Sequence, residues 1–214
     1  MTRAHRLLAG LLAAGALLTA GCAQSVDPIE RLGRKAAQKV TPGAGAPGSA
    51  VHKRWGLAGP LAAAPKPPAH RLSTAYVVDR VHTPDKVVFL TFDEGAAHDP
   101  RFVRMTTELK LPVSMFRRSA RSDLRALSYE RQRAEICGQR GRHLFRLPHA
   151  TYNEDTLRAA ADCGIRAVVL AREYAEGDRL RPGDIVRAEA RTTVWLLRRI
   201  QEQGYAVARL EDYV

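Results

Sequence analysis

Residues Val87 to Gly95 read Val-Val-Phe-Leu-Thr-Phe-Asp-Glu-Gly, an apolar run that ends in two adjacent carboxylates and a glycine. A run of this length, rich in β-branched and aromatic residues and bounded by turn formers, is typical of a strand buried on both faces. Strands of this kind belong to α/β proteins, whose chemistry lies at the carboxyl ends of the parallel strands. The sequence therefore predicts that Asp93 and Glu94 lie in a functional cleft.

Strand and helix patterns alternate along the second half of the chain. This alternation predicts an α/β domain in which helices connect parallel strands. Strands are expected at 75–80, 86–92, 112–116, around 145, 166–170, 184–188 and 205–209, and helices at 100–109, 128–139, 153–163 and 192–203.

Turn and cap signals set the ends of these elements. The turn formers at 83–85 predict that the first two strands form a hairpin. Asp99 is the expected N-cap of the first of these helices, with a proline at its first position, and Asn153 is the expected N-cap of the third. Gly164 and Gly204 are the expected stops of the third and fourth helices.

Three segments together resemble one known family. The segment ending in Asp93 resembles the T-F-D-D-G motif of the polysaccharide deacetylase (NodB-like) family. Residues 144–153 resemble its R-P-P-Y-G-x-Y-N segment, and residues 181–186, Arg-Pro-Gly-Asp-Ile-Val, resemble the stretch before its L-x-H motif. The resemblance implies that residues 73–214 form a distorted (β/α) barrel. Because this chain lacks some of the family's connecting pieces, the sequence is compatible with either a closed or an incomplete barrel.

The matched positions imply roles for individual residues. By resemblance, Asp93 takes the position of the catalytic base, Glu94 that of a metal-binding acid, and Arg146 that of the arginine that orients the base. The residues at substrate-binding positions are Pro148, His149 and Tyr152.

The chain departs from the family motifs where the chemistry is expected. Glu189 stands where the family has its general-acid histidine, and no histidine lies between residues 116 and 128, where the metal-binding pair is expected. A catalytic metal needs about three converging protein ligands. Two alternatives remain: a cleft without a metal, or a zinc or cobalt site rebuilt from Glu94, His98 and His149.

Two functions from different classes follow from this resemblance. In the first, the domain binds cell-wall glycan in the cleft without turning it over, because the metal pair and the imidazole acid are missing. In the second, it is a metal-dependent hydrolase that removes N-acetyl groups from cell-surface polysaccharide, with Glu189 as a buried, protonated acid. A third interpretation, a decaying sequence without a present role, predicts poor expression and no defined cleft.

The first residues have the pattern of a bacterial export signal. Arg3 and Arg6 precede an apolar stretch at 7–18, which is shorter than the roughly 20 residues of a membrane span, and residues 18–22 match a lipoprotein cleavage box. We expect a signal peptide at 1–21, a lipidated Cys22 on the outer face of the cytoplasmic membrane, and an Ala/Gly/Pro-rich tether to residue 72 that does not fold. An uncleaved membrane anchor is the alternative.

The formal net charge of the 214-residue chain is +12, and without Arg3 and Arg6 it is +10. Such a charge favours polyanionic partners. The arginines accompany no nucleic-acid-binding module, so nucleic acid is not expected, and wall glycan or an anionic envelope polymer is favoured. The alternative is an arginine-rich surface that reflects a GC-rich genome.

Two cysteines follow Cys22, each near the end of an expected helix. Export favours a disulfide between Cys137 and Cys163, and two buried thiols are the alternative, because sequence cannot show whether their Cα atoms lie within about 7 Å. The oligomeric state is also open, since strands left unpaired by missing pieces would invite pairing with another chain.

Overall fold

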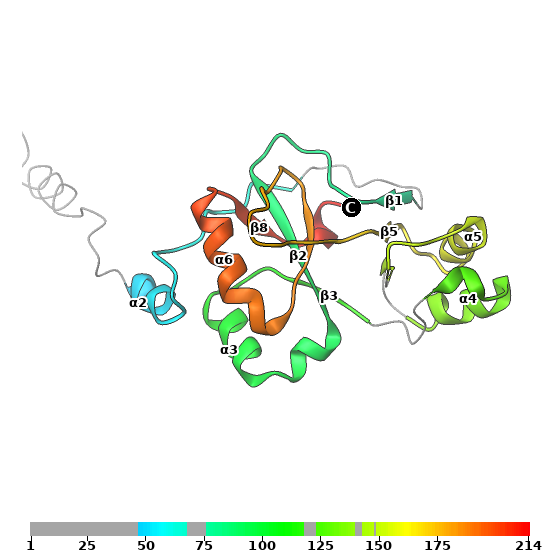
Figure 1. The fold of residues 1–214 in the computed structure, drawn as a ribbon, viewed down its shortest axis with the longest axis horizontal. Coiled ribbons are helices and arrows are strands. Elements are labelled where there is room, and N and C mark those ends of the chain that lie inside the picture. Colours follow the sequence, from blue (N-terminus) through cyan, green and yellow to red (C-terminus); the bar gives the residue numbers. More distant parts are fainter. Residues whose placement is uncertain (1–46, 68–75, 118–122, 140–142, 148) are drawn as a thin grey trace, which may run out of the picture. The chain divides into compact units, whose positions relative to one another are not determined.

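A computed structural model describes residues 47–67, 76–117, 123–139, 143–147 and 149–214 (Figure 1). The strands are β1 Tyr76–Val78, β2 Val87–Asp93, β3 Ser114–Phe116, β4 Leu144–Arg146, β5 Ala167–Val169, β6 Arg172–Glu173, β7 Ile185–Arg187 and β8 Ala206–Ala208. The α-helices are α2 Pro47–Arg54, α3 Pro100–Glu108, α4 Tyr129–Cys137, α5 Glu154–Asp162 and α6 Thr193–Glu202. Short 3-10 helices are η1 Glu94–His98, η2 Leu124–Ala126, η3 Ala190–Thr192 and η4 Leu210–Asp212.

The strands form two parallel sheets. One has the order β3-β2-β7-β6, with β8 also paired to β2, and the other has the order β1-β5-β4. The expected α/β class with parallel strands is confirmed. Within the described residues the two sheets are separate and do not close into one barrel.

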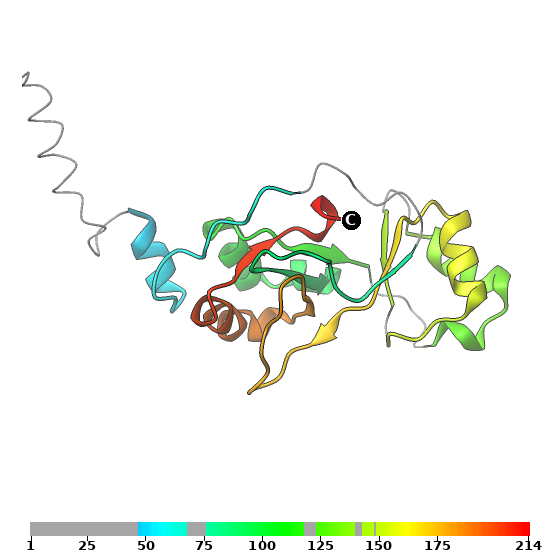
Figure 2. The same ribbon diagram turned by 90° about the horizontal axis from the view of Figure 1, so that it is seen from above.

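Strand β2 is the centre of the larger sheet. Its residues from Val87 to Phe92 are fully buried, and it pairs with three strands: β8 along its first residues, β7 in the middle and β3 at its carboxyl end. The apolar run meets neighbours on both edges and both faces, as such a run requires. Helices α3 and α6 cover one face of this sheet (Figure 2), and Phe102, Met105 and Leu197 pack there against Leu90 and Phe92.

The expected hairpin between the first two strands is wrong. Strand β1 pairs with β5 of the smaller sheet, in the register Tyr76 to Ala167, and not with β2. The connection instead lies against the turn before β7, where the Val81 N–H donates to the Gly183 carbonyl at 2.9 Å. Gly183 has φ +81°, and a Cβ built there would stand 1.8 Å from the Val81 carbonyl oxygen. The Arg-Pro-Gly-Asp segment is therefore a structural turn in which position 183 accepts only glycine.

The expected unfolded tether is also wrong for its described part, residues 47–67. This strap, as we call residues 47–67, contains helix α2, and Leu57 is 2% exposed within the main core. Ala62 forms a parallel bridge with Ala206 of β8, and the Trp55 indole N–H donates to the Glu108 carboxylate at 2.7 Å.

The strap folds because it packs against α6 and β8. The Gln201 side chain on α6 accepts from the Ala58 N–H at 3.0 Å and donates to the Gly59 carbonyl at 2.9 Å. The low apolar content of the strap predicted disorder. Hydrogen bonds and packing against α6 and β8 supply the stabilisation that the strap's own sequence does not. Residues 1–46, which include the expected signal peptide and Cys22, lie outside the described residues. Among the described helices, none has the length and apolar character to cross a membrane.

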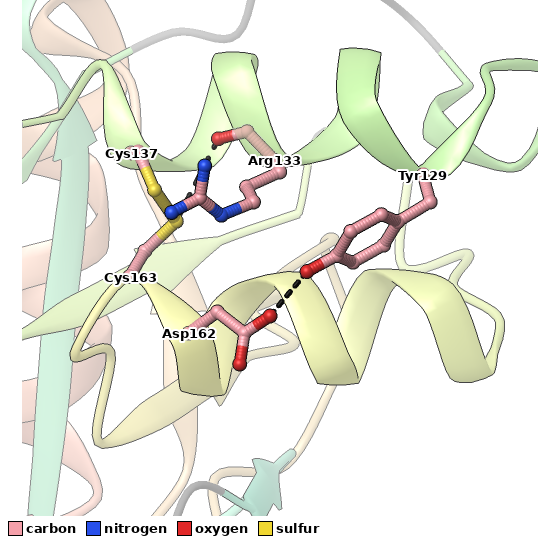
Figure 3. Close-up of a disulfide and its surroundings, with 5 residues drawn as sticks. All are labelled: Tyr129, Arg133, Cys137, Asp162 and Cys163. Atoms are coloured by element: carbon pink, nitrogen blue, oxygen red, sulfur yellow. Dashed lines mark hydrogen bonds between the residues drawn. A yellow bond between two sulfur atoms is a disulfide. The ribbon is translucent and has the colours of Figure 1, made fainter.

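Helices α4 and α5 pack side by side on the smaller sheet and are joined by a disulfide (Figure 3). The Cα atoms of Cys137 and Cys163 are 5.0 Å apart, so the disulfide is the alternative that the structure supports. The Tyr129 hydroxyl also donates to the Asp162 carboxylate across the two helices. The cap predictions for the neighbouring helices are confirmed: the Asn153 side chain caps α5, and that of Asp99 caps α3.

Candidate functional site

Three charged side chains converge from the carboxyl ends of three strands. Asp93, Arg146 and Arg187 are the last residues of β2, β4 and β7, respectively. Arg146 Nη2 donates to Asp93 Oδ1 across the gap between the two sheets. The structure thus brings together the carboxylate and the arginine that the resemblance paired, at the edge where parallel strands place chemistry. The role of Asp93 as a base stays a prediction.

Arg146 is a buried cation, with a side chain only 5% exposed. Its Nη1 donates to Thr91 Oγ1 at 3.0 Å, the Thr91 hydroxyl donates to the Val186 carbonyl at 3.0 Å, and the guanidinium lies over the Phe116 ring. Burial, and secondarily the positive charge of Arg187, lowers the pKa of Arg146 to about 10. The guanidinium therefore stays charged at neutral pH and needs a carboxylate beside it.

Arg187 is the site residue that the sequence reasoning did not single out. Its Nη2 lies 3.3 Å from Asp93 Oδ2, so each oxygen of this carboxylate faces a guanidinium. The signal that points to Arg187 is its position, because it ends the strand that follows Arg-Pro-Gly-Asp and lies beside Thr91 in the β2–β7 register. The strand-end rule that selected Asp93 applies equally to Arg187.

A cleft of about 370 Å³ opens beside this cluster. Its lining comes from the end of β2, η1 and the segment after β7: Asp93, Gly95, Ala96, Asp99, Arg187, Ala188, Glu189, Ala190 and Arg191. The volume is within the range of small-ligand pockets, roughly 300–1,000 Å³. Carboxylate and guanidinium groups give the cleft both hydrogen-bond acceptors and donors.

Glu189 lies in the cleft with Asp93, but its surroundings do not match the expected acid. Its side chain is 59% exposed, and its carboxylate is 2.6 Å from Arg191 Nε. A carboxyl group that serves as general acid is held protonated by burial away from cations. The expected burial of Glu189 is not observed, and its role as the general acid stays a prediction.

The structure does not assemble the rebuilt metal site. Glu94 and His98 lie at opposite ends of η1, His149 follows β4, and both histidines are exposed. Across the described parts of the chain, no group of three or more His, Cys, Asp or Glu side chains is placed to hold a metal ion. The described residues therefore do not fit the metal that the resemblance implied.

The expected substrate-binding residues are only partly visible. Tyr152 is 39% exposed and His149 is exposed, and neither belongs to the lining of the cleft. Pro148 lies outside the described residues. A substrate-binding role for these three residues stays a prediction.

Comparison with solved structures defines the class of fold. The wild-type Bacillus anthracis protein BA3943, described as a CE4 family pseudoenzyme, matches with a TM-score of 0.51 and 15% identity over 64% of this chain and 68% of that chain. A BA3943 mutant with restored enzymatic activity matches with a TM-score of 0.50 and 16% identity over 64% and 70% of the two chains. The chain has the α/β fold of these carbohydrate esterase family 4 (CE4) proteins.

Comparison of sequences gives the family. The uncharacterized protein SCO4760 of Streptomyces coelicolor is 41% identical over 191 residues, which cover 64% of this chain and 77% of the relative. The chain belongs to the family of this Streptomyces protein. Because 64% of 214 residues is fewer than 191, the alignment contains positions that this chain lacks. No protein-family model matches the chain.

Proposed function

We propose that the chain is an exported lipoprotein whose CE4-like domain binds cell-wall glycan in the cleft beside Asp93 without deacetylating it. The observation that carries this proposal is the state of Asp93, whose two oxygens face Arg146 and Arg187. A base must bring one of its oxygens to the water that it deprotonates, and here guanidinium groups lie against both oxygens.

The other parts of the family's chemistry are also weak in this cleft. Amide hydrolysis by this route needs a metal to polarise the acetyl carbonyl and an acid to protonate the leaving amine. The described residues bring no three ligands together, and Glu189 is exposed and paired with Arg191. BA3943, which has the same fold, is itself described as a pseudoenzyme, although a mutant of it has restored activity, so this fold also occurs without activity.

The composition of the cleft supports a sugar ligand. Hydroxyl groups both donate and accept hydrogen bonds, and the cleft wall offers exposed carboxylates such as Glu189 and exposed guanidinium groups such as Arg191. Arg187 and Arg191 in the cleft wall also suit an anionic group on an envelope polymer, because guanidinium groups pair with carboxylates and phosphates.

One binding experiment tests the proposal. The purified chain is titrated with chitooligosaccharides and with peptidoglycan fragments by calorimetry, and acetate release is measured on the same ligands. We expect saturable binding without acetate release, and Arg191→Ala should weaken binding by about tenfold, the effect of losing one charged hydrogen bond. Arg131→Ala, an exposed arginine on α4 away from the cleft, is the matched control. Absence of binding to every glycan would refute the proposal.

The alternative is an active metal-dependent hydrolase acting on N-acetylated cell-surface polysaccharide. One observation favours it: Glu189 and Asp93 line the same cleft, so an acid and a base could act on one substrate. Acetate release that depends on added zinc or cobalt and disappears in Asp93→Asn would establish this alternative in place of the first.

The lipoprotein part of the proposal has its own test. We expect the wild-type chain to fractionate with membranes and Cys22→Ala to accumulate as the unprocessed precursor, because lipid attachment at Cys22 precedes cleavage. A mature N-terminus at any residue other than Cys22 would contradict it.

A further inference from the structure

We infer that Arg187 is the resident cation of the cleft: its guanidinium balances the Asp93 carboxylate and keeps a divalent metal from binding there. The inference rests on the proposed function only in taking the cleft beside Asp93 as the functional site. It starts from the disagreement between the implied metal and the residues present.

The backbone holds Arg187 in place. Arg187 is opposite Thr91 in the parallel β2–β7 pairing, and the next residue, Ala188, donates its N–H to the Thr91 carbonyl at 2.9 Å. The Arg187 side chain therefore starts from a strand end beside the one that carries Asp93. A cation placed by two paired strands requires little reordering to meet its carboxylate.

Arg146 and Arg187 have different roles. Arg146 is buried and splits its donors between Asp93 and the Thr91 hydroxyl, which ties the two sheets together. Arg187 is 35% exposed and forms part of the cleft wall, so it is the cation that a ligand meets. A guanidinium stays protonated at any physiological pH, which makes it a permanent charge.

Two guanidinium groups beside one carboxylate exclude a second kind of cation. A divalent ion at Asp93 Oδ2 would compete with Arg187, whose nitrogen is already 3.3 Å away, and like charges at such distances repel. Glu173 also approaches Arg187, at 4.0 Å, but its side chain is 85% exposed, so the attraction is screened.

A double-mutant cycle on thermal stability tests the inference. Arg187→Ala is expected to lower the melting temperature by about 3–6 °C in the wild-type background and by less than about 1 °C in the Asp93→Asn background, because the pair is then already broken. Arg191→Ala, whose pair with Glu189 is exposed, is the matched control with a change of less than about 1 °C in either background. Equal losses for Arg187→Ala in both backgrounds would overturn the inference, since packing alone would explain them.

A second pair of measurements remains decisive if Asp93→Asn, which strands the buried Arg146, does not fold. Methylguanidinium at about 10 mM should raise the melting temperature of Arg187→Ala by about 1–2 °C and leave wild type and Arg191→Ala unchanged. Zinc and cobalt should bind wild type with no defined stoichiometry in calorimetry. One equivalent of metal on wild type, or no rescue of Arg187→Ala, would overturn the inference. Both readouts are independent of glycan binding, so failure of the proposed function would be seen separately.

Discussion

The two sheets of the domain reach stability by different means. The β2 half, which is the sheet around β2 with α3 and α6, has a core of large side chains such as Phe92 and Phe102 around a fully buried strand. The β5 half, which is the sheet β1-β5-β4 with α4 and α5, has a smaller core that includes Ala159 and Ala160, and it has a disulfide. A small core buries less surface, and a covalent link offsets that deficit. The candidate site forms where the two halves meet.

The largest effect is expected at the contact between the halves. Arg146→Ala removes the cation that joins Asp93 and Thr91 across the sheets, leaves a cavity over Phe116, and should lower the free energy of unfolding by about 3–5 kcal/mol. Urea denaturation measures the loss. Arg146→Lys, which keeps the charge but not the fork of donors, should recover only part of it. A full recovery in Arg146→Lys would show that the contribution of Arg146 comes from its charge and not from its fork of donors.

The second-largest effect is expected at the disulfide, which lies in the β5 half alone and therefore tests whether the two halves unfold independently. Replacing Cys137 and Cys163 together by serine should cost about 3 kcal/mol, because the bridge closes a sequence separation of 26 residues in the unfolded chain. Hydrogen exchange should show the loss of protection in α4 and α5 and little change in β2. Equal loss in both halves would mean that they unfold as one unit.

The smallest effect concerns the strap on the β2 half. Hydrogen bonds from Arg104, then Trp55 and Arg54, lower the pKa of Glu108 from 4.5 to about 2. Because the folded-state pKa is depressed, Glu108 stabilises the strap above about pH 4.5, and this contribution is lost as the pH falls toward 2. Trp55 fluorescence should report release of the strap over this range. In Glu108→Gln the signal should be the same at pH 5 and pH 3, and an unchanged wild-type transition in that variant would contradict the assignment.

Local patterns predicted the elements well, because their causes are local. The burial of β2 follows from its uninterrupted apolar run, and the caps at Asp99 and Asn153 follow from side chains that reach backbone groups within three residues. The hairpin prediction failed because the turn at 83–85 is compatible with several partners. The close approach of Gly183 to Val81 decided which partner β1 takes.

The pairings in the site depended on contacts far apart in the sequence. The resemblance pointed to Asp93 and Arg146, which are 53 residues apart, but nothing near Arg187 in the sequence marks it as a partner of Asp93, 94 residues away. The strap illustrates the same limit, since its order depends on Gln201 of α6 and on Ala206 of β8.

By itself the sequence determined that a buried strand delivers a carboxylate to the carboxyl end of a parallel sheet, that capped helices connect the strands, and that two cysteines stood near helix ends. Only the tertiary structure decided that Asp93 lies between two guanidinium groups, that Glu94, His98 and His149 form no metal-binding group and that Cys137 pairs with Cys163. The physical reason is the range of the interactions. Burial periodicity and capping act within a few residues, whereas ion pairs and disulfides depend on Å-scale distances that only the packing of the two sheets sets.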